Sequence, residues 1–219
     1  MHELIEGLTW IKQSTYRWAG DGVTVYVDVW GAGEDPVPAD VVFITHPHYD
    51  HFDEDDLARI KKDDTVVVAP RDLAAKLSGE IIAVSPGETV EARGVKGETV
   101  PAYNIVEHRL TKHPKEKEWV GYVLDLGGTT FYFSGDTDHV PEQDQIRADA
   151  AFVCVGGDPF IMGPEEASEV VKAIDPRVAV PGHYGWACGT PASAETFRKA
   201  AEPVPVDIIT PVVPFESTA

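Results

Sequence analysis

The segment from His46 to Asp53, His-Pro-His-Tyr-Asp-His-Phe-Asp, limits most strongly what this chain can fold into and do. It places three imidazoles and two carboxylates within eight residues, directly after the apolar run 41–44. Imidazole and carboxylate are the ligand types that zinc, manganese and iron share. Three of the eight histidines of the chain lie here, a concentration that a solvated loop rarely has. The segment therefore predicts a metal site.

The local backbone of this segment is predicted to be a loop. Pro47 disfavours helical dihedrals at His46, so the histidines do not share one face of a helix, as they do in the His-Glu-x-x-His zinc proteases. The stretch 53–62, in contrast, has acids in its first turn and bases in its last turn, which favours a helix. We therefore expect Asp53 to cap that helix and not to bind metal.

Composition excludes several classes of function. Eighteen Lys and Arg against 37 Asp and Glu give a formal charge of −19, which disfavours binding to nucleic acid or to an anionic membrane. The apolar runs are shorter than the roughly 20 residues that span a bilayer, and residues 1–6 do not resemble a secretory signal. Two cysteines do not make a disulfide framework. We expect a cytoplasmic protein; the oligomeric state is not indicated.

The pattern of apolar residues predicts alternating strands and helices in one α/β domain, residues 1–219. Residues 23–30 alternate apolar and polar side chains, as a half-buried strand does. Further strands are predicted at 41–44, 65–69, 81–84, 90–92, 119–126, 129–134, 151–155, 178–180 and 206–209. Helices are predicted at 53–62, 72–77, 164–174 and 191–200.

Three of these predicted strands stop at a residue that can bind metal. The run 43–45 ends at His46, the run 131–135 at Asp136, and the run 178–182 at His183. Strand ends are where α/β proteins place binding groups, because the sheet is rigid and the following loop is accessible. The glycine before Asp136 and before His183 permits backbone turns that other residues resist. We therefore expect the three segments to contribute to one site.

In these motifs the sequence resembles the metallo-β-lactamase-fold hydrolases. Their motif His-x-His-x-Asp-His lies at 46–51, and it is followed in the same order by Ser-Gly-Asp-Thr at 134–137 and Pro-Gly-His-Tyr at 181–184. Shorter stretches at 101–104, 121–122 and 161–167 resemble one subgroup, the small metal-dependent hydrolases related to ascorbate-6-phosphate lactonase. The resemblance covers nearly the whole chain. It implies a four-layer αββα sandwich with the metal site at one edge, between two sheets.

The resemblance also implies a site for two metal ions. One ion would be held by His46, His48 and a middle histidine. The other would be held by Asp50, His51 and His183, and Asp136 would bridge the two ions. The middle histidine is His113 if the subgroup's pattern upstream of Gly-Tyr applies, and His108 is the alternative. Zinc is the expected metal, with manganese, nickel and iron as alternatives.

The implied reaction is hydrolysis of an ester-type bond, in a lactone, phosphodiester or thioester, by a hydroxide that bridges the two ions. Asp50 would bind metal and also orient this nucleophile. Two dications and two carboxylates leave about +2 in the cleft, which suits a small anionic substrate. Two rival interpretations stay open: an iron-dependent oxidoreductase on the same fold, and a metal-binding module without turnover.

Other residues have weaker assignments. Asp28, at the end of the first predicted strand, is interpreted either as a partner of a metal-binding imidazole or as a turn residue. Tyr184, with Trp186, either supports the site or packs in a loop. Asp138 and His139 are candidates for lining the pocket. Cys154 is expected in the core, and Cys188 is assigned no role.

Overall fold

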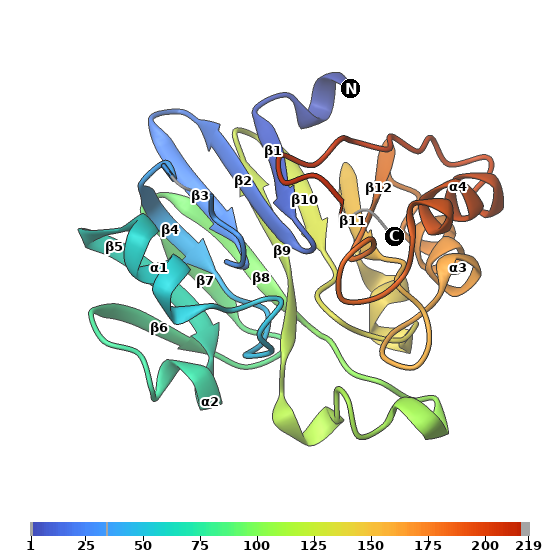
Figure 1. Ribbon diagram of the computed structural model, residues 1–219, viewed down its shortest axis with the longest axis horizontal. Coiled ribbons are helices and arrows are strands. Elements are labelled where there is room, and N and C mark those ends of the chain that lie inside the picture. Colours follow the sequence, from blue (N-terminus) through green and yellow to red (C-terminus); the bar gives the residue numbers. More distant parts are fainter. Residues whose placement is uncertain (1, 34, 216–219) are drawn as a thin grey trace.

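Two six-stranded sheets face each other in the computed structural model, which describes residues 2–33 and 35–215 (Figure 1). The first sheet contains, in order, β1 (Leu8–Lys12), β2 (Thr15–Gly20), β3 (Val23–Val27), β4 (Ala39–Phe43), β5 (Lys61–Pro70) and β6 (Glu80–Val84). The second contains β12 (Val178–Gly182), β11 (Ala150–Cys154), β10 (Thr129–Phe133), β9 (Val120–Leu126), β8 (Val95–Pro101) and β7 (Thr89–Ala92). Each sheet is therefore built from one half of the chain.

Helices cover the outer face of each sheet, as Figure 1 shows. On the first sheet lie α1 (Glu54–Ile60) and α2 (Arg71–Ala74), and on the second lie α3 (Pro164–Ile174) and α4 (Pro191–Ala200). Short 3-10 helices occur at η1 (Glu3–Ile5), η2 (Glu107–Arg109), η3 (Lys115–Lys117) and η4 (Pro141–Gln145). The expected four-layer αββα order is confirmed.

Strand β4 shows why the run before the histidine cluster is apolar on both sides. Val41 and Phe43 pack toward the second sheet, whereas Val42 and Ile44 pack with the residues of α1 and α2. The strand pairs in parallel with β3 and β5, and a parallel strand covered on both faces has no polar side. The chain leaves this rigid strand at Ile44 and reaches His46 two residues later.

Two hydrogen bonds join the sheets next to the histidine cluster. The hydroxyl of Tyr122, in β9, donates to the backbone oxygen of Ile44 over 2.8 Å. The backbone N–H of Val120 donates to the backbone oxygen of Thr45 over 3.2 Å. These groups are buried, so losing either partner would leave an unsatisfied polar group in the core. The second sheet is therefore fixed against the end of β4.

Most of the predicted elements are confirmed, with bounds that differ by a few residues. The predicted strand at 206–209 is wrong, because Val206 forms only an isolated bridge with Ala179 and the chain then leaves the sheet. Strands β1, β2 and β8 were not predicted. The structure contains, within the residues it describes, no helix long and apolar enough to cross a membrane.

Gly121 allows β9 to approach the segment that leads to Asp136. A Cβ atom at this position would lie 2.6 Å from the backbone oxygen of Phe133 and 2.7 Å from that of Ser134. We predict that Gly121→Ala lowers the free energy of unfolding by about 1–3 kcal/mol, because the backbone must shift. Thermal unfolding measures this as a lower Tm. An unchanged Tm would show that the two strands can separate without cost.

Candidate metal centre

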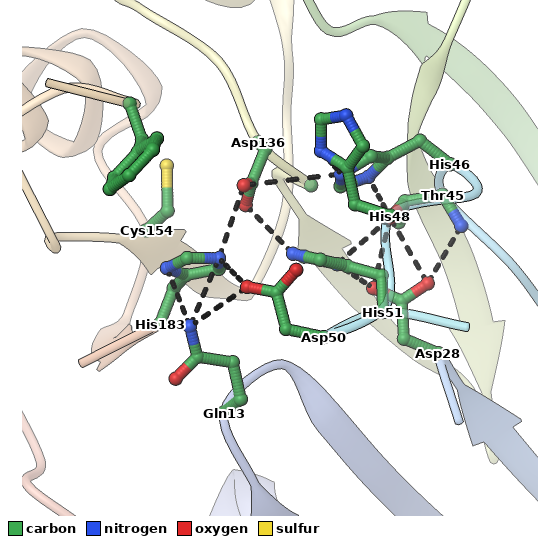
Figure 2. A network of polar contacts seen from close by, with 12 residues as sticks. Gln13, Asp28, Thr45, His46, His48, Asp50, His51, Asp136, Cys154 and His183 are labelled. Carbon is green, nitrogen blue, oxygen red and sulfur yellow. Dashed lines mark hydrogen bonds and ion pairs between the residues drawn. The ribbon is translucent and has the colours of Figure 1, made fainter. Parts of the chain in front are cut away.

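Seven side chains that can bind metal meet at one edge of the molecule, where the sheets face each other. Figure 2 labels all of them except His113. All except His48 are buried. They come from the loop after β4, from the loop between β8 and β9, and from the ends of β10 and β12: His46, His48, Asp50, His51, His113, Asp136 and His183. The structure thus brings together the whole set that the sequence predicted, with His113 as the middle histidine.

One group of donor atoms, called here the first donor group, consists of three histidines. His48 Nδ1 lies 3.0 Å from His46 Nε2 and 3.2 Å from His113 Nε2. Ligands that bind one zinc ion tetrahedrally at about 2.0–2.1 Å are roughly 3.3 Å apart. The spacing of these three nitrogens therefore fits a single ion.

The second donor group consists of Asp50, His51 and His183. His183 Nε2 lies 3.3 Å from Asp50 Oδ2 and 3.1 Å from Asp136 Oδ2. Asp136 faces both groups, since its Oδ2 is also 3.3 Å from Nε2 of His113 in the first group. A carboxylate in this position can contact ions in both groups, as the bridging role requires.

Two donor atoms show that the cluster fits metal better than internal hydrogen bonds. His51 Nε2 and Asp136 Oδ1 lie 3.1 Å apart, yet neither has a hydrogen-bond partner within residues 2–33 and 35–215. An unsatisfied buried polar group costs about 1–3 kcal/mol. Divalent metal ions would satisfy both atoms, and a set of imidazoles and carboxylates suits zinc, manganese or iron.

The loop after β4 folds back as expected. The backbone N–H groups of His51 and Phe52 both donate to the oxygen of His48, over 3.0 and 2.8 Å. Asp53 then caps α1, because its side chain accepts a hydrogen bond from the N–H of Asp56 over 2.9 Å. The prediction that Asp53 is a helix cap is confirmed, and it has no place among the donor atoms.

Asp28 lies behind the second donor group. Its Oδ2 accepts a hydrogen bond from His51 Nδ1 over 2.6 Å, and its Oδ1 accepts one from the backbone N–H of Thr45 over 2.7 Å (Figure 2). A carboxylate at the far nitrogen of an imidazole fixes the ring and makes its other nitrogen a better ligand. Of the two interpretations of Asp28, contact with a site imidazole is the one that the structure shows.

The two donor groups differ in protonation. Burial lowers the pKa of His46 well below its usual range and that of His48 to about 4, so both imidazoles are neutral at pH 7. Burial also acts on His51, but Asp136 and Asp28 outweigh it and raise its pKa to about 10. For His183 burial is likewise outweighed, chiefly by Asp136, and the pKa is raised well above its usual value.

A cavity of about 250 Å³ opens above the cluster. Both donor groups reach it, and so do aromatic, cationic and thiol side chains that lie outside them. Its lining is His48, Tyr49, Asp50, Lys112, His113, Asp136, Phe160, His183, Ala187 and Cys188. The cavity is smaller than the 300–1,000 Å³ typical of drug-sized ligands, which favours a small substrate.

Several candidates from the sequence lie elsewhere. Tyr184 is buried with its ring 5.1 Å from that of Trp10, and it is absent from the cavity lining, so it does not support the site as the sequence allowed. Trp186 packs in the same aromatic group. His108, the alternative middle histidine, is exposed and lies 2.7 Å from Asp158.

The residues after Asp136 also point away from the cavity. Asp138 is buried in an ion pair with Arg109, and His139 pairs with Asp144 at the surface. Cys154 is buried in β11, as expected for a core residue. Cys188, which was given no role, lines the cavity with its Sγ 3.2 Å from His183 Nδ1.

Sequence reasoning missed Gln13 and Lys112, which both contact the site. Gln13 occupies the turn between β1 and β2, a hairpin that was not predicted, and its amide reaches Asp50 and His183. The β-branched and aromatic residues at 8–18 were the signal that could have revealed that hairpin. Lys112 precedes His113, but its sequence neighbours do not indicate which way it points.

Comparison with known proteins agrees with this geometry. A family model described as the β-lactamase superfamily domain matches residues 7–183. The chain belongs to this superfamily. A UPF0173 metal-dependent hydrolase of Thermoplasma acidophilum is 31% identical to it over 184 residues, which cover 80% of this chain and 78% of that protein.

Two further relatives extend the match. A UPF0173 metal-dependent hydrolase of Methanopyrus kandleri is 28% identical over 219 residues and covers 92% of this chain and 94% of its own length. The crystal structure of a metal-dependent hydrolase from Parabacteroides distasonis superposes with a TM-score of 0.80 at 28% identity, covering 92% of this chain and 91% of that one. The expected family and fold are confirmed, whereas the narrower likeness to ascorbate-6-phosphate lactonase stays a prediction.

The protonation of the two donor groups predicts how zinc binding depends on pH. A ligand imidazole must be neutral, so His51 and His183 have to lose protons when metal binds, whereas His46 and His48 are already neutral. We expect binding at the second group at pH 7 to release about two protons and to strengthen as pH rises toward 10. Calorimetric titration of metal-free protein with zinc, in buffers of different ionisation heat, measures this release. Affinity that falls with rising pH would contradict the assignment.

Proposed function

We propose that this protein, a metal-dependent hydrolase of the metallo-β-lactamase fold, uses two divalent metal ions to cleave an ester-type bond in a small substrate. His46, His48 and His113 would hold one ion, Asp50, His51 and His183 the other, and Asp136 would contact both. When bound, the ions would lower the pKa of a water molecule toward neutrality and polarise the oxygen of the substrate bond. Zinc is the metal that this donor set favours first.

The observation that supports this proposal most is the arrangement of donor atoms around Asp136. Its two oxygens lie 3.1–3.3 Å from nitrogens of three imidazoles in both donor groups. Burial alone would raise the pKa of this carboxyl, but His183 and His51 hold it well below its usual range. A permanently ionised carboxylate between two sets of ligands is what a two-ion site requires.

Asp50 is the chain's own candidate for orienting the attacking water. It belongs to the second donor group and also lines the cavity, so its carboxylate faces both the metal site and the space for substrate. Burial would raise its pKa, but the hydrogen bond from His183 contributes to holding it at about 2. The group is therefore ionised at neutral pH and can accept a hydrogen bond from a water molecule in the cavity.

The cavity also supports the choice of substrate. Two dications together with the carboxylates of Asp50 and Asp136 would give the floor of the cavity a net charge of about +2. A small anion would therefore be attracted to it, even though the whole chain carries a formal charge of −19. A volume of about 250 Å³ is too small to enclose a long polymer. The proposal is therefore a lactone, phosphodiester or thioester of low molecular mass.

Metal content and one substitution test this function. Protein purified without added metal should contain about two equivalents of zinc or manganese by elemental analysis. Asp50→Ala should lower kcat/KM about 10²–10⁴-fold on whichever substrate responds in a screen of lactones, phosphodiesters, thioesters and β-lactams, because the group that orients the water is lost.

Asp53→Asn is the matched control, since it changes a carboxylate in the same loop that caps a helix, and asparagine is an equally good cap. It should retain full activity. Mainly iron with redox-active spectra would favour the oxidoreductase interpretation, and a protein unable to bind metal would overturn the proposal. Unchanged turnover in Asp50→Ala would show that another group orients the water.

A further inference from the structure

One wall of the cavity contains a cation without a carboxylate partner. The amine of Lys112 lies 5.1 Å from the centre of the Phe160 ring, and both residues line the cavity beside Asp136 and His183. Neighbouring cations are paired, Arg109 with Asp138 and Lys115 with Glu142. For Lys112 no carboxylate lies within ion-pair distance in the part of the chain that the structure describes. In a chain with twice as many acids as bases, such a lysine is available to a ligand.

The loop that carries Lys112 is fixed by the ion pairs of one buried arginine, Arg109. Arg109 contacts Asp138 over 2.7 Å, Asp158 over 2.6 Å and Glu166 over 2.9 Å. The backbone N–H of Lys112 donates to the oxygen of Arg109 over 2.9 Å. These contacts order the backbone from which the Lys112 side chain extends, so a ligand does not have to order the loop when it binds.

Phe160, whose ring faces the Lys112 amine, is held by a residue of the same loop. The side-chain amide of Asn104 donates to the oxygen of Phe160 over 2.7 Å and to that of Arg109 over 3.0 Å. Asn104 therefore joins the backbone next to Phe160 to the loop that carries Lys112. Tyr49 and Ala187 also line the cavity, so its lining offers apolar surface as well as the positive charge of Lys112.

We propose that Lys112 and Phe160 form a subsite for a carboxylate or phosphate group attached to a flat apolar group. This inference rests on the proposed function and names its substrate class: small esters that carry such an anion beside the bond that is cleaved. The metal ions would act on the bond, and Lys112 would bind the anion. Removing a charged hydrogen-bond donor from such a contact costs about tenfold or more in affinity.

Binding of simple anions to zinc-loaded protein tests the subsite without a known substrate. Lys112→Met keeps the length of the side chain and removes its charge. We expect it to weaken binding of benzoate and phenyl phosphate about tenfold in calorimetry, and to leave binding of neutral benzamide unchanged. Lys117→Met, an exposed lysine of η3, is the matched control and should bind all three as the wild type does.

The outcomes separate the subsite from the function. A loss confined to one of the two anions supports the subsite and assigns it to carboxylate or to phosphate. Equal affinities of wild type and Lys112→Met for both anions would overturn it. If the protein holds no metal, the proposed function fails, and the same titrations on metal-free protein then decide the subsite: a loss of anion affinity in Lys112→Met would still establish it.

A separate observation concerns Gln13, whose side chain is buried beneath the second donor group (Figure 2). Its backbone is held in a left-handed turn, with φ of 48°, and its carbonyl accepts hydrogen bonds from Trp10 Nε1 over 2.9 Å and from the N–H of His183 over 3.2 Å. The turn therefore aims the side chain at the site. It does not point into the β1–β2 hairpin or toward solvent.

The amide of Gln13 has one suitable acceptor. Its Nε2 lies 3.3 Å from Asp50 Oδ2, and 3.0 and 3.2 Å from the two ring nitrogens of His183. When His183 binds metal through Nε2, the ion would use the lone pair of that nitrogen and Nδ1 would carry the hydrogen, so neither ring nitrogen could accept a hydrogen bond from Gln13. The acceptor of the Gln13 amide is therefore Asp50 Oδ2. Gln13 Oε1 has no hydrogen-bond partner among the described residues, a cost that a purely structural residue would not need.

We infer that Gln13 is a positioning residue for the second ion, acting through Asp50. Its N–H holds Oδ2 of the carboxylate in place against His183, so that both ligands are oriented before metal arrives. This inference also rests on the proposed two-ion site. Partners of this kind, which touch a ligand and not the ion, contribute about 10–100-fold to metal affinity.

Release of zinc from the loaded protein into a chromophoric chelator tests this role. Gln13→Met keeps the volume of the side chain and removes its donor. We expect the zinc ion of the second donor group to leave at about 10–100-fold lower chelator concentration than in wild type. The zinc ion at His46, His48 and His113 should leave as it does in wild type. Gln143→Met is the matched control, because Gln143 is an equally buried amide that donates to Tyr132 away from the site.

A merely structural role would give a different result. Gln143→Met should lower Tm and leave both zinc equivalents unchanged. If Gln13→Met releases zinc as the wild type does, or weakens both equivalents alike, the inference is wrong. A wild type that holds fewer than two equivalents would instead overturn the two-ion function.

Discussion

The burial of one carboxylate, Asp136, among imidazoles is the constraint on which the rest of the site depends. Its side chain is 4% exposed and lies within 4.0 Å of nitrogens from His46, His51, His113 and His183. An isolated carboxylate is expensive to bury, so the positions of the surrounding rings are not free to vary. Those rings come from both sheets, and the bonds of Tyr122 and Val120 to the end of β4 keep the sheets at the required spacing.

Local patterns in the sequence predicted the strands and helices of an α/β domain, and the family resemblance implied their order in four layers. Apolar runs such as 41–44 are buried on both faces in the structure, and the helices begin where capping residues indicate. The errors occurred where the local sequence pattern does not match the way the segment pairs in the folded protein. The run 206–209 is apolar, but it pairs with the edge of the sheet through one bridge only. Strand β8 contains Gly97 and Pro101, which weaken a strand pattern that pairing with β9 overrides.

The ligands could be predicted because residues 46–51 are themselves a motif and the family resemblance implied the other three, and the structure places all seven together. The residues around them could not, since their roles arise from contacts between distant segments. Gln13 meets Asp50 across 37 positions and His183 across 170. The choice between His113 and His108 had a partial signal in the sequence, the subgroup's pattern upstream of Gly-Tyr, which favoured His113. The structure agrees: His113 lies 3.3 Å from Asp136, whereas His108 pairs with Asp158 at the surface.

Each sheet is built from one half of the chain, and each proposed ion draws ligands from both halves. During synthesis the first half would emerge with four of the seven donors and without a complete site for either ion. Metal capture would therefore follow the docking of the second sheet. Bound ions would then act as a noncovalent clamp between the halves, and any opening of the sheets would let metal escape. The rate of metal exchange would thus measure how often the two halves separate.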